Sequence, residues 1–345
     1  AIELSPNYAT AYQWYSVQLW SYPARADEQL ALIRKAVELD PVSPIMQLNL
    51  GAAYMSIGEL NAAKEQLLRL AELQPTFSRT YVALSALEAN YLGNIDEGLR
   101  YAMEARRNDP GSIRNLTREA NMWTQLGDEE AARRVLSEME EMDANHQLTV
   151  QRTLDLALNF GSNAALRETL NWALPKFIKS NQVGLGPGHT ALMLSDLEQA
   201  RELYLLAEPG WVQQESWDEL LPRRFTHACT ISWVLERTGD AELGKDLRSA
   251  AMRFYDEHLP AVTQHPDIYT PELCHLAAVD TERALASLET RFEHGHITGW
   301  TSLHRSPLFD PLRDEPRYVE LMNQREAVIA EQRARVEAAD WSKGP

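Results

Sequence analysis

Apolar residues recur at steps of three and four along most of the chain, in segments separated by glycine, proline or short polar runs. Leu50 and Tyr54 belong to one such segment, and Leu67 and Leu70 belong to the next. This period is typical of amphipathic helices that each bury one face. We therefore predict an all-α protein of about 17 helices without strands.

The prolines of the first half are spaced almost regularly. Pro41 and Pro75 lie 34 residues apart, and Pro110 follows 35 residues later. The segment between the first two contains, in order, Leu50, Gly51, Tyr54, Gly58, Ala63, Leu67 and Leu70. This order of large, small, aromatic and turn residues, closed by a proline, resembles the tetratricopeptide (TPR) repeat, which is a hairpin of two antiparallel helices.

The residue types of this repeat have physical reasons. Gly51 and Ala63 are small enough to let the two helices approach closely where they cross. Gly58 can adopt the positive φ that ends the first helix, and Pro75 cannot continue the second. Because one hairpin cannot bury its apolar face alone, the resemblance implies stacked repeats, an α-solenoid wound as a right-handed superhelix.

The same frame extends to both sides. An upstream repeat at 6–41 turns at Tyr22-Pro23-Ala24 without a glycine, and two downstream repeats turn at Gly93 and Gly127. We assign residues 1–144 to a regular TPR array of about four repeats. Residues 1–7 match the last helical turn of a further repeat, so we expect this array to be preceded by the rest of a truncated one.

Residues 145–305 keep the helical pattern but lose the repeat signature. We expect degenerate TPR-like pairs with helices at 150–160, 164–178, 190–194, 197–206, 217–237, 241–258, 271–278 and 281–293. Three glycines and a proline between Val183 and Gly188 exclude a helix there and predict a loop. Ser195-Asp196 is the candidate cap of the helix at 197–206.

Residues 306–345 are the expected C-terminal cap, with a final helix at about 319–339. Leu308, Phe309, Leu312 and Tyr318 would cover the open apolar face of the last pair, and the whole chain is expected to be one continuous solenoid. This ending resembles that of bacterial signalling proteins in which a TPR array follows a winged-helix, adenylate/guanylate cyclase or TolB-like domain. The resemblance implies a regulatory role and leaves the attached domain open.

Charge and cysteine content bear on partners and compartment. The formal net charge of −17 argues against nucleic-acid binding by this piece, because phosphate binding needs clustered Lys and Arg. No apolar run is long enough for a membrane span in this piece. Cys229 and Cys274 are expected to be two reduced thiols in or near the core. We expect a cytoplasmic location; a disulfide, or a transmembrane helix elsewhere in the protein, would favour the periplasm.

We predict no catalytic constellation, no cofactor and no metal site. The Gly-x-Ser-x-Gly nucleophile motif does not occur. His227 and Cys229 are too close along one helix to face each other. His294, His296 and His304 lack the ligand spacing of a zinc site and are interpreted as surface histidines of a loop. This chain is therefore predicted not to be an enzyme, although an attached cyclase domain would be one.

The first helix of each TPR repeat lines the concave face of the solenoid. In the repeat frame that face carries Asn49, Arg79, Asn90, Arg114, Arg118 and Asn121. Arginine offers two parallel hydrogen bonds to a carboxylate, and asparagine can pair with a peptide backbone. These six residues form our candidate peptide-binding groove. The alternative is that the arginines pair with carboxylates of adjacent helices.

The groove resembles in part the carboxylate-clamp TPRs that hold chaperone C-termini. Gln13 and Val17 stand where the clamp has its leading Lys and Asn, so a chaperone tail is not favoured. The sequence favours a non-catalytic protein-protein interaction or sensing module of a larger bacterial regulatory protein, with a peptide or protein in the groove. Two alternatives remain. One is a small-ligand sensor with a pocket in the irregular region 183–217, and the other is a self-association module for an attached effector domain.

Overall fold

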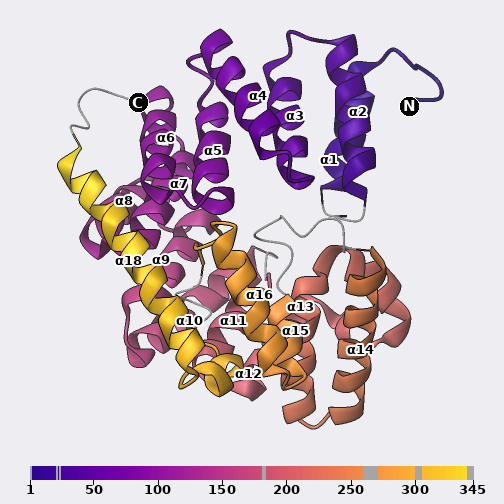
Figure 1. Ribbon diagram of the computed structural model, residues 1–345, viewed down its shortest axis with the longest axis vertical. Coiled ribbons are helices and arrows are strands. Elements are labelled where there is room, and N and C mark those ends of the chain that lie inside the picture. Colours follow the sequence, from indigo (N-terminus) through magenta and orange to yellow (C-terminus); the bar gives the residue numbers. More distant parts are fainter. Residues whose placement is uncertain are drawn as a thin grey trace.

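The computed structural model describes residues 2–20, 22, 25–180, 184–258, 271–299 and 305–339. These residues form helices and turns, with no β-strand among them (Figure 1). The all-α prediction is therefore confirmed. Pro23 and Ala24 of the first predicted turn, and Val183 of the predicted loop, lie outside the described residues.

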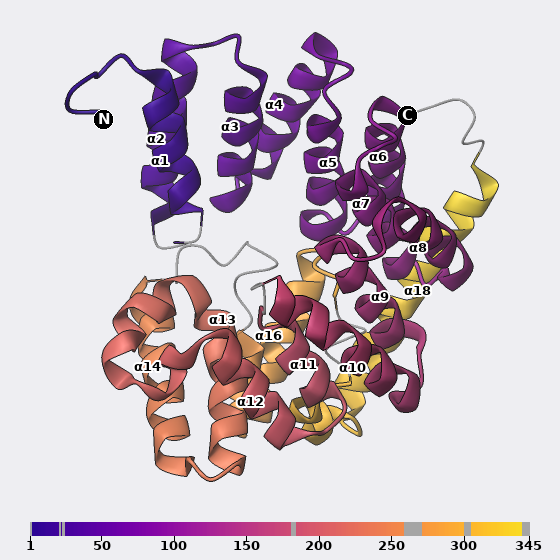
Figure 2. The ribbon, with the colours of Figure 1, turned by 180° about the vertical axis from the view of Figure 1, so that it is seen from behind.

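The first half consists of four helical hairpins stacked side by side (Figures 1 and 2). Their helices are α1 Ala9–Leu19, α2 Ala26–Leu39, α3 Pro44–Ser56, α4 Leu60–Leu73, α5 Ser78–Ala86, α6 Ile95–Asn108, α7 Ile113–Gln125 and α8 Glu129–Asp143. The predicted turn residues Gly58, Gly93 and Gly127 have φ of 78°, 73° and 74°. Glycine adopts this left-handed conformation without the steric cost of a Cβ atom, which explains its place in each turn.

The predicted close crossing of α3 and α4 is present. A Cβ atom at Gly51 would lie 2.8 Å from Cδ2 of Leu67, so no larger residue fits without movement. Ala63, on the facing helix, is fully buried. The small residues of the repeat signature are thus needed for packing at this crossing.

A π-helical segment, η2 Leu87–Tyr91, interrupts the hairpin of the third repeat. The N–H of Leu92 donates to the carbonyl of Leu87 over 3.1 Å, a step of five residues in place of four. A π-turn accommodates one extra residue within a helix. The third repeat has one more residue than the second, and this segment is where the structure absorbs it.

The second half contains further helices that pack against their neighbours in sequence. Its helices are α9 Gln147–Phe160, α10 Asn163–Lys179, α11 Gly186–Met193, α12 Leu197–Ala207, α13 Trp217–Arg237, α14 Ala241–His258, α15 Pro271–Ala277 and α16 Thr281–Glu293, with short 3-10 segments at Pro209–Val212 and Gln214–Ser216. Helices α13, α14 and α16 begin and end where the sequence predicts. Asp196 caps α12, because its Oδ1 accepts from the N–H of Gln199 over 3.3 Å.

The prediction that no helix forms between Val183 and Gly188 is wrong, because α11 begins at Gly186. Pro187 lies in the first turn, where a missing N–H costs nothing and the fixed φ suits a helix. Gly188 is required by packing, since a Cβ atom there would lie 2.5 Å from the ring of Tyr204. Gly188, which indicates a loop in the sequence, thus serves helix packing instead, whereas an added Cβ atom at Gly184 or Gly186 would meet nothing within 4 Å.

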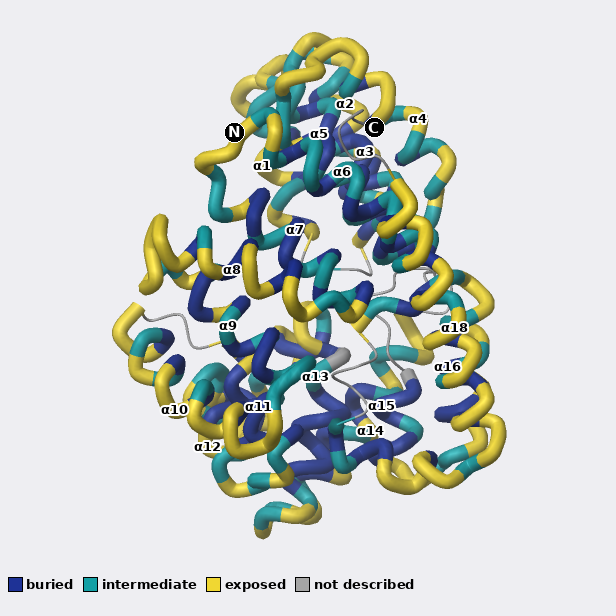
Figure 3. The backbone as a smooth tube through the Cα atoms, turned by 90° about the vertical axis from the view of Figure 1, so that its left-hand side faces the viewer, coloured by how far each residue is buried: buried dark blue, intermediate teal, exposed yellow. Residues whose placement is uncertain are grey.

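The prediction of two reduced thiols is also wrong. Cys229 of α13 and Cys274 of α15 form a disulfide whose Cα atoms are 4.8 Å apart. Both cysteines belong to the largest apolar cluster, which runs from α9 to the C-terminal helix. Figure 3 shows that much of α13 and α15 is buried. The pairing follows from the direct packing of two helices that the sequence does not show to be neighbours.

The C-terminal cap consists of a 3-10 segment, η5 Pro307–Leu312, and a long helix, α18 Pro316–Ala338. Leu308, Phe309, Leu312 and Tyr318 are buried in the large cluster, which confirms the predicted cover of the last helical pair. Helix α18 then continues past that pair and lies against α6 of the third repeat (Figures 1 and 2). Its Ile329 and Val336 share a separate apolar cluster with residues of α6 and α7.

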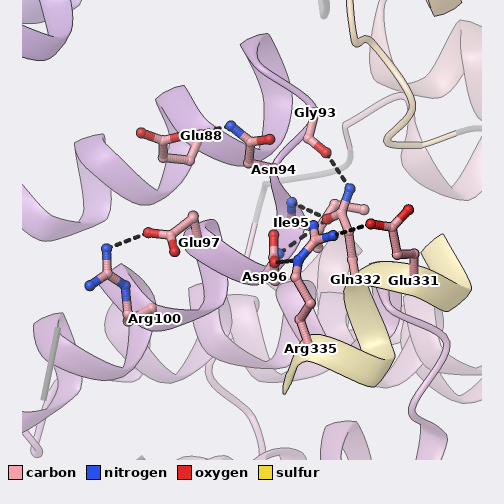
Figure 4. A network of polar contacts seen from close by, with 10 residues as sticks. All are labelled: Glu88, Gly93, Asn94, Ile95, Asp96, Glu97, Arg100, Glu331, Gln332 and Arg335. Carbon is pink, nitrogen blue, oxygen red and sulfur yellow. Dashed lines mark hydrogen bonds and ion pairs between the residues drawn. The ribbon is translucent and has the colours of Figure 1, made fainter. Parts of the chain in front are cut away.

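Gln332 of α18 fixes this return contact (Figure 4). Its Oε1 accepts from the N–H groups of Ile95 and Asp96 over 2.6 and 3.2 Å, and its Nε2 donates to the carbonyl of Gly93 over 2.7 Å. The first N–H groups of a helix lack partners within the helix. Asn94, the N-cap of α6, makes no cap bond with its side chain, so Gln332 supplies the cap from the other end of the chain.

Ion pairs formed by Arg335 lie beside the Gln332 cap. Arg335 pairs with Asp96 over 2.6 Å and with Glu331 over 2.9 Å (Figure 4). The residue after Gln332, Arg333, donates from its Nε to the carbonyl of Leu126 over 2.7 Å. We call Gln332, Arg333 and Arg335 with their partners the C-terminal clasp.

Candidate peptide-binding groove

The predicted groove residues lie on the first helices of successive repeats. Arg79 and Arg114 are exposed and occupy the second position of α5 and of α7, respectively. Among the residues that the structure describes, neither arginine makes an ion pair or a side-chain hydrogen bond. A cation in the first turn of a helix is disfavoured by the helix dipole. These two charges therefore do not stabilise their own helices, and an anion placed beside them would be attracted both by the guanidinium group and by the helix end.

Arg118 and Asn121 lie further along α7 and contact neighbouring helices. The Nε of Arg118, which is half-buried, donates to Oγ of Ser85 on α5 over 2.8 Å. Asn121 accepts from Nη1 of Arg152 on α9 over 3.3 Å. Asn49 on α3 and Asn90 on η2 are half-buried. The six predicted residues thus include two exposed cations, one arginine tied to a hydroxyl, and three partly accessible amides.

Sequence reasoning missed two residues that extend this polar row. Arg152 is buried, and its Nη2 forms an ion pair with Oδ2 of Asp155 over 2.9 Å. These residues lie 34 positions after Arg118 and Asn121, so they occupy the same places in the fifth, degenerate repeat. The repeat spacing was therefore a usable signal, although the apolar signature of that repeat had faded. The polar row crosses α5, α7 and α9.

The polar row ends at a cavity of about 250 Å³ between α9, the start of α11, and α13. Gln151 and Asp155 of α9, His189 of α11 and His227 of α13 contribute polar groups to its wall. Asp155 retains 31% of its side-chain surface. Desolvation nevertheless raises the pKa of this carboxyl group, and Arg152 opposes that change in part.

Both cavity histidines are neutral at physiological pH. Burial lowers the pKa of His189, despite its bond to the carbonyl of Leu185. Burial, with smaller contributions from His189 and Arg224, lowers the pKa of His227 to about 3. A cationic ligand would therefore meet no positive histidine in this cavity.

The interpretation of the C-terminal histidines as surface residues is wrong for one of them. His294 is exposed, but His296 is buried, with 4% of its surface accessible. Burial is the main cause that lowers the pKa of His296 to about 4. His304 lies outside the described residues. The described parts of the chain contain no group of three or more His, Cys, Asp or Glu side chains that could hold a metal ion.

A third feature is an aromatic surface on α1, at the end of the array. Tyr8 and Trp14 expose 53% and 58% of their surface. Ile2 and Tyr15 join Tyr8 and Trp14 around an open hollow. Contiguous exposed apolar patches on a protein surface mark interaction sites.

The helical hairpins, turn glycines and repeat spacing define a TPR-type α-solenoid. No protein-family model matches the chain, and no curated protein matches it. A search of solved structures found chains that are similar to it over most of its length, and three of them are described here. The first is the APC/C hetero-tetramer Cut9-Hcn1, with a TM-score of 0.49 and 16% identity; the match covers 94% of this chain and 56% of that chain. The second is the TPR domain of P58(IPK), with a TM-score of 0.27, 11% identity, and coverage of 94% of this chain and 98% of that chain. The third is yeast Tom70, with a TM-score of 0.29, 14% identity, and coverage of 95% of this chain and 97% of that chain. The chain thus spans a little over half of the matched chain in the first of these.

No helix in the described part of the chain has both the length and the apolar character needed to cross a membrane.

Proposed function

We propose that this chain is a non-catalytic interaction or sensing module of a larger bacterial regulatory protein, and that its concave groove binds an acidic or C-terminal peptide segment. The groove is formed by Asn49, Arg79, Asn90, Arg114, Arg118 and Asn121. One observation carries the proposal. In a chain with a net charge of −17, two arginines at matching positions of adjacent repeats face solvent without an ion pair to any described residue.

The chemistry of the groove suits a carboxylate. A free guanidinium group can donate two parallel hydrogen bonds to one carboxylate, and such charge-assisted bonds are worth about 1.5–3 kcal/mol each. The amides of Asn49 and Asn90 can accept from and donate to a peptide backbone. Because the whole chain is acidic, a basic patch of this kind would also orient an approaching acidic segment.

Fluorescence polarisation with labelled acidic peptides that carry a free C-terminal carboxylate would test this proposal. Arg114→Ala should weaken binding about tenfold or more, and Arg79→Ala should do the same. Arg69→Ala is the matched control, because Arg69 is also exposed but lies on α4, the second helix of its repeat. Binding should weaken as salt concentration rises. Equal effects of Arg114→Ala and Arg69→Ala, or no dependence on salt, would reject the groove.

The disulfide bears on the compartment. Disulfides persist in the periplasm and outside the cell and are rare in the cytosol. The pairing of Cys229 with Cys274 therefore supports the periplasmic alternative over the cytoplasmic location. We propose that the module senses or binds its partner on the oxidising side of a membrane. The attached effector domain, whether winged-helix, cyclase or TolB-like, would then be separated from it by a transmembrane helix outside this piece. We propose no nucleic-acid binding by this chain.

Self-association is a second candidate function, favoured by the aromatic surface on α1. Trp14 and Tyr8 are more than half exposed there, and pairing of two such surfaces would bury apolar area and bring two effector domains together. Sedimentation velocity over a range of concentrations would show a dimer that Trp14→Ser dissociates. A chain that sediments as a monomer at every concentration would contradict this candidate.

A further inference from the structure

The cavity beside α9 has one wall built from a single helix face. Gln147, Gln151, Leu154, Asp155 and Leu158 recur at helical spacing and all line it. The same face belongs to the first helix of the degenerate fifth repeat, so the cavity lies at the end of the polar row described above. The rest of the wall comes from α10, the start of α11, and α13.

Three polar groups that line this cavity, on Asp155, His189 and Thr190, can accept a hydrogen bond. Nδ1 of His189 lies 2.9 Å from the carbonyl oxygen of Leu185. A carbonyl oxygen only accepts, so Nδ1 carries the hydrogen, and Nε2 of the neutral ring is an acceptor. The hydroxyl of Thr190 already donates to the carbonyl of Gly186 over 3.1 Å, which leaves its lone pairs to accept.

Asp155 adds the negative charge. Its ion pair with Arg152 joins Oδ2 to Nη2, and Arg152 is shared with Asn121 on the neighbouring helix. The carboxylate remains partly accessible at the cavity wall. A partly desolvated carboxylate gains from a second positive partner. Apolar atoms of Leu154, Leu158 and Phe177 surround these polar groups.

We propose that this cavity binds a small organic cation, namely a primary ammonium group on a short apolar stem. The ammonium group would donate its three hydrogens to Asp155, to Nε2 of His189 and to the hydroxyl of Thr190. The stem would pack on Leu154, Leu158 and Phe177. The volume of about 250 Å³ suits a molecule of this size and excludes a folded partner.

The proposal names the ligand class for the small-ligand alternative and does not depend on the peptide groove. Free amines and the lysine side chain of a bound peptide share this chemistry. Isothermal titration calorimetry of the whole chain with 2-phenylethylamine tests the cavity alone. 2-Phenylethanol, of the same shape without the charge, should bind at least about tenfold more weakly. Phenylacetate, of opposite charge, should not bind.

Two variants test the position of the site. Asp155→Asn keeps the shape of the side chain and should weaken amine binding about tenfold or more. Because this change could also leave Arg152 without its partner and destabilise the fold, Gln151→Lys provides a second test at an exposed position of the cavity wall. It should weaken amine binding by charge repulsion without lowering the melting temperature. Asn171→Lys, exposed on α10 and outside the cavity wall, is the matched control.

The outcomes separate the two proposals. Loss of amine binding in Gln151→Lys but not in Asn171→Lys or Arg114→Ala supports the cavity. Equal affinity for the amine and the alcohol, no heat up to about 10 mM amine, or equal effects of the two lysine variants would overturn it. A lysine-containing peptide that competes with 2-phenylethylamine would identify a peptide side chain as the source of the cation, and a peptide without lysine that fails to compete would be the control.

Discussion

At the scale of single residues, the left-handed turns at Gly58, Gly93 and Gly127 and the close helix crossing at Gly51 each constrain the residue type. The turn glycines and Gly51 could be assigned from spacing alone, because a positive φ or a close helix crossing leaves few alternatives. His296 and Arg152 were not predicted to be buried. The burial of a polar side chain depends on which distant segments cover it, and a local pattern carries no information about that.

Gly51→Leu tests the crossing of α3 and α4. The new side chain would collide with Leu67, whose Cδ2 lies 2.8 Å from the position of an added Cβ. Overpacking typically costs about 1–3 kcal/mol, and a branched side chain at a helix crossing should reach the upper end. Gly111→Leu is the control, because nothing lies within 4 Å of a Cβ atom at Gly111. Urea denaturation should show a large loss for Gly51→Leu alone; equal losses would mean that this crossing is not tight.

His296 should make the fold less stable in acid. Its pKa is lowered to about 4 in the folded state, mainly by burial, with smaller contributions from Arg291 and His294. An unfolded histidine titrates near 6.5. The stabilisation from the neutral buried ring is therefore complete above about pH 6.5 and is lost as the pH falls toward 4, by on the order of 3 kcal/mol.

The pH dependence of the unfolding free energy separates this histidine from others. His296→Gln should flatten the decline between about pH 6.5 and 4. His294→Gln, at an exposed neighbouring position, should leave the slope as it is. An unchanged slope in His296→Gln would show that this ring is not buried in solution.

At the scale of elements, periodicity predicted most helices well. The bounds of α13, α14 and α16 agree with the sequence. The turn that contains Gly239, at a φ of 102°, separates the first two, and Asp280 caps the third. The second half of helix α11 was predicted at 190–194, but its first turn was assigned to a loop. Gly186 and Pro187 serve the helix start and Gly188 packs closely on Tyr204, whereas these residue types usually indicate a loop. The π-segment η2 was missed because an extra residue in a repeat can be absorbed in either a turn or a helix.

The disulfide between α13 and α15 should contribute measurably to stability. It closes a loop of 45 residues, and cross-links of this kind typically contribute about 2–4 kcal/mol by restricting the unfolded chain. Replacing both cysteines by serine should lower the melting temperature, and a reductant should lower that of the wild-type protein but not of the double variant. Alkylation of both thiols in denatured protein purified without reductant would show that the bond does not form.

At the scale of the whole molecule, the sequence indicated a capped solenoid but not its closure. The cover of the last helical pair by Leu308 and Phe309 could be predicted, since an exposed apolar end needs a cap. The contact of α18 with the third repeat could not be predicted, because it depends on the accumulated curvature of all the repeats between the third repeat and α18. Gln332 and Ile95 are 237 residues apart in sequence and have no local pattern in common.

The clasp gives the last prediction. Gln332→Leu keeps the size of the side chain but removes the partners of the N–H groups of Ile95 and Asp96 and of the Gly93 carbonyl. A buried polar group left without a partner costs about 1–3 kcal/mol, so a loss of several kcal/mol in the unfolding free energy is expected. Gln324→Leu, at an exposed position of the same helix, should cost little.

Hydrogen exchange distinguishes loss of the clasp from general weakening of the fold. If Gln332 caps α6 in solution, the amides of Ile95 and Asp96 should exchange much faster in Gln332→Leu, while buried amides of α13 should keep their relative protection. Because the clasp joins the third repeat to the end of the chain, its loss should also enlarge the radius of gyration measured by X-ray scattering. Unchanged exchange at Ile95, together with an unchanged radius, would mean that α18 does not return to α6 and that the solenoid is open.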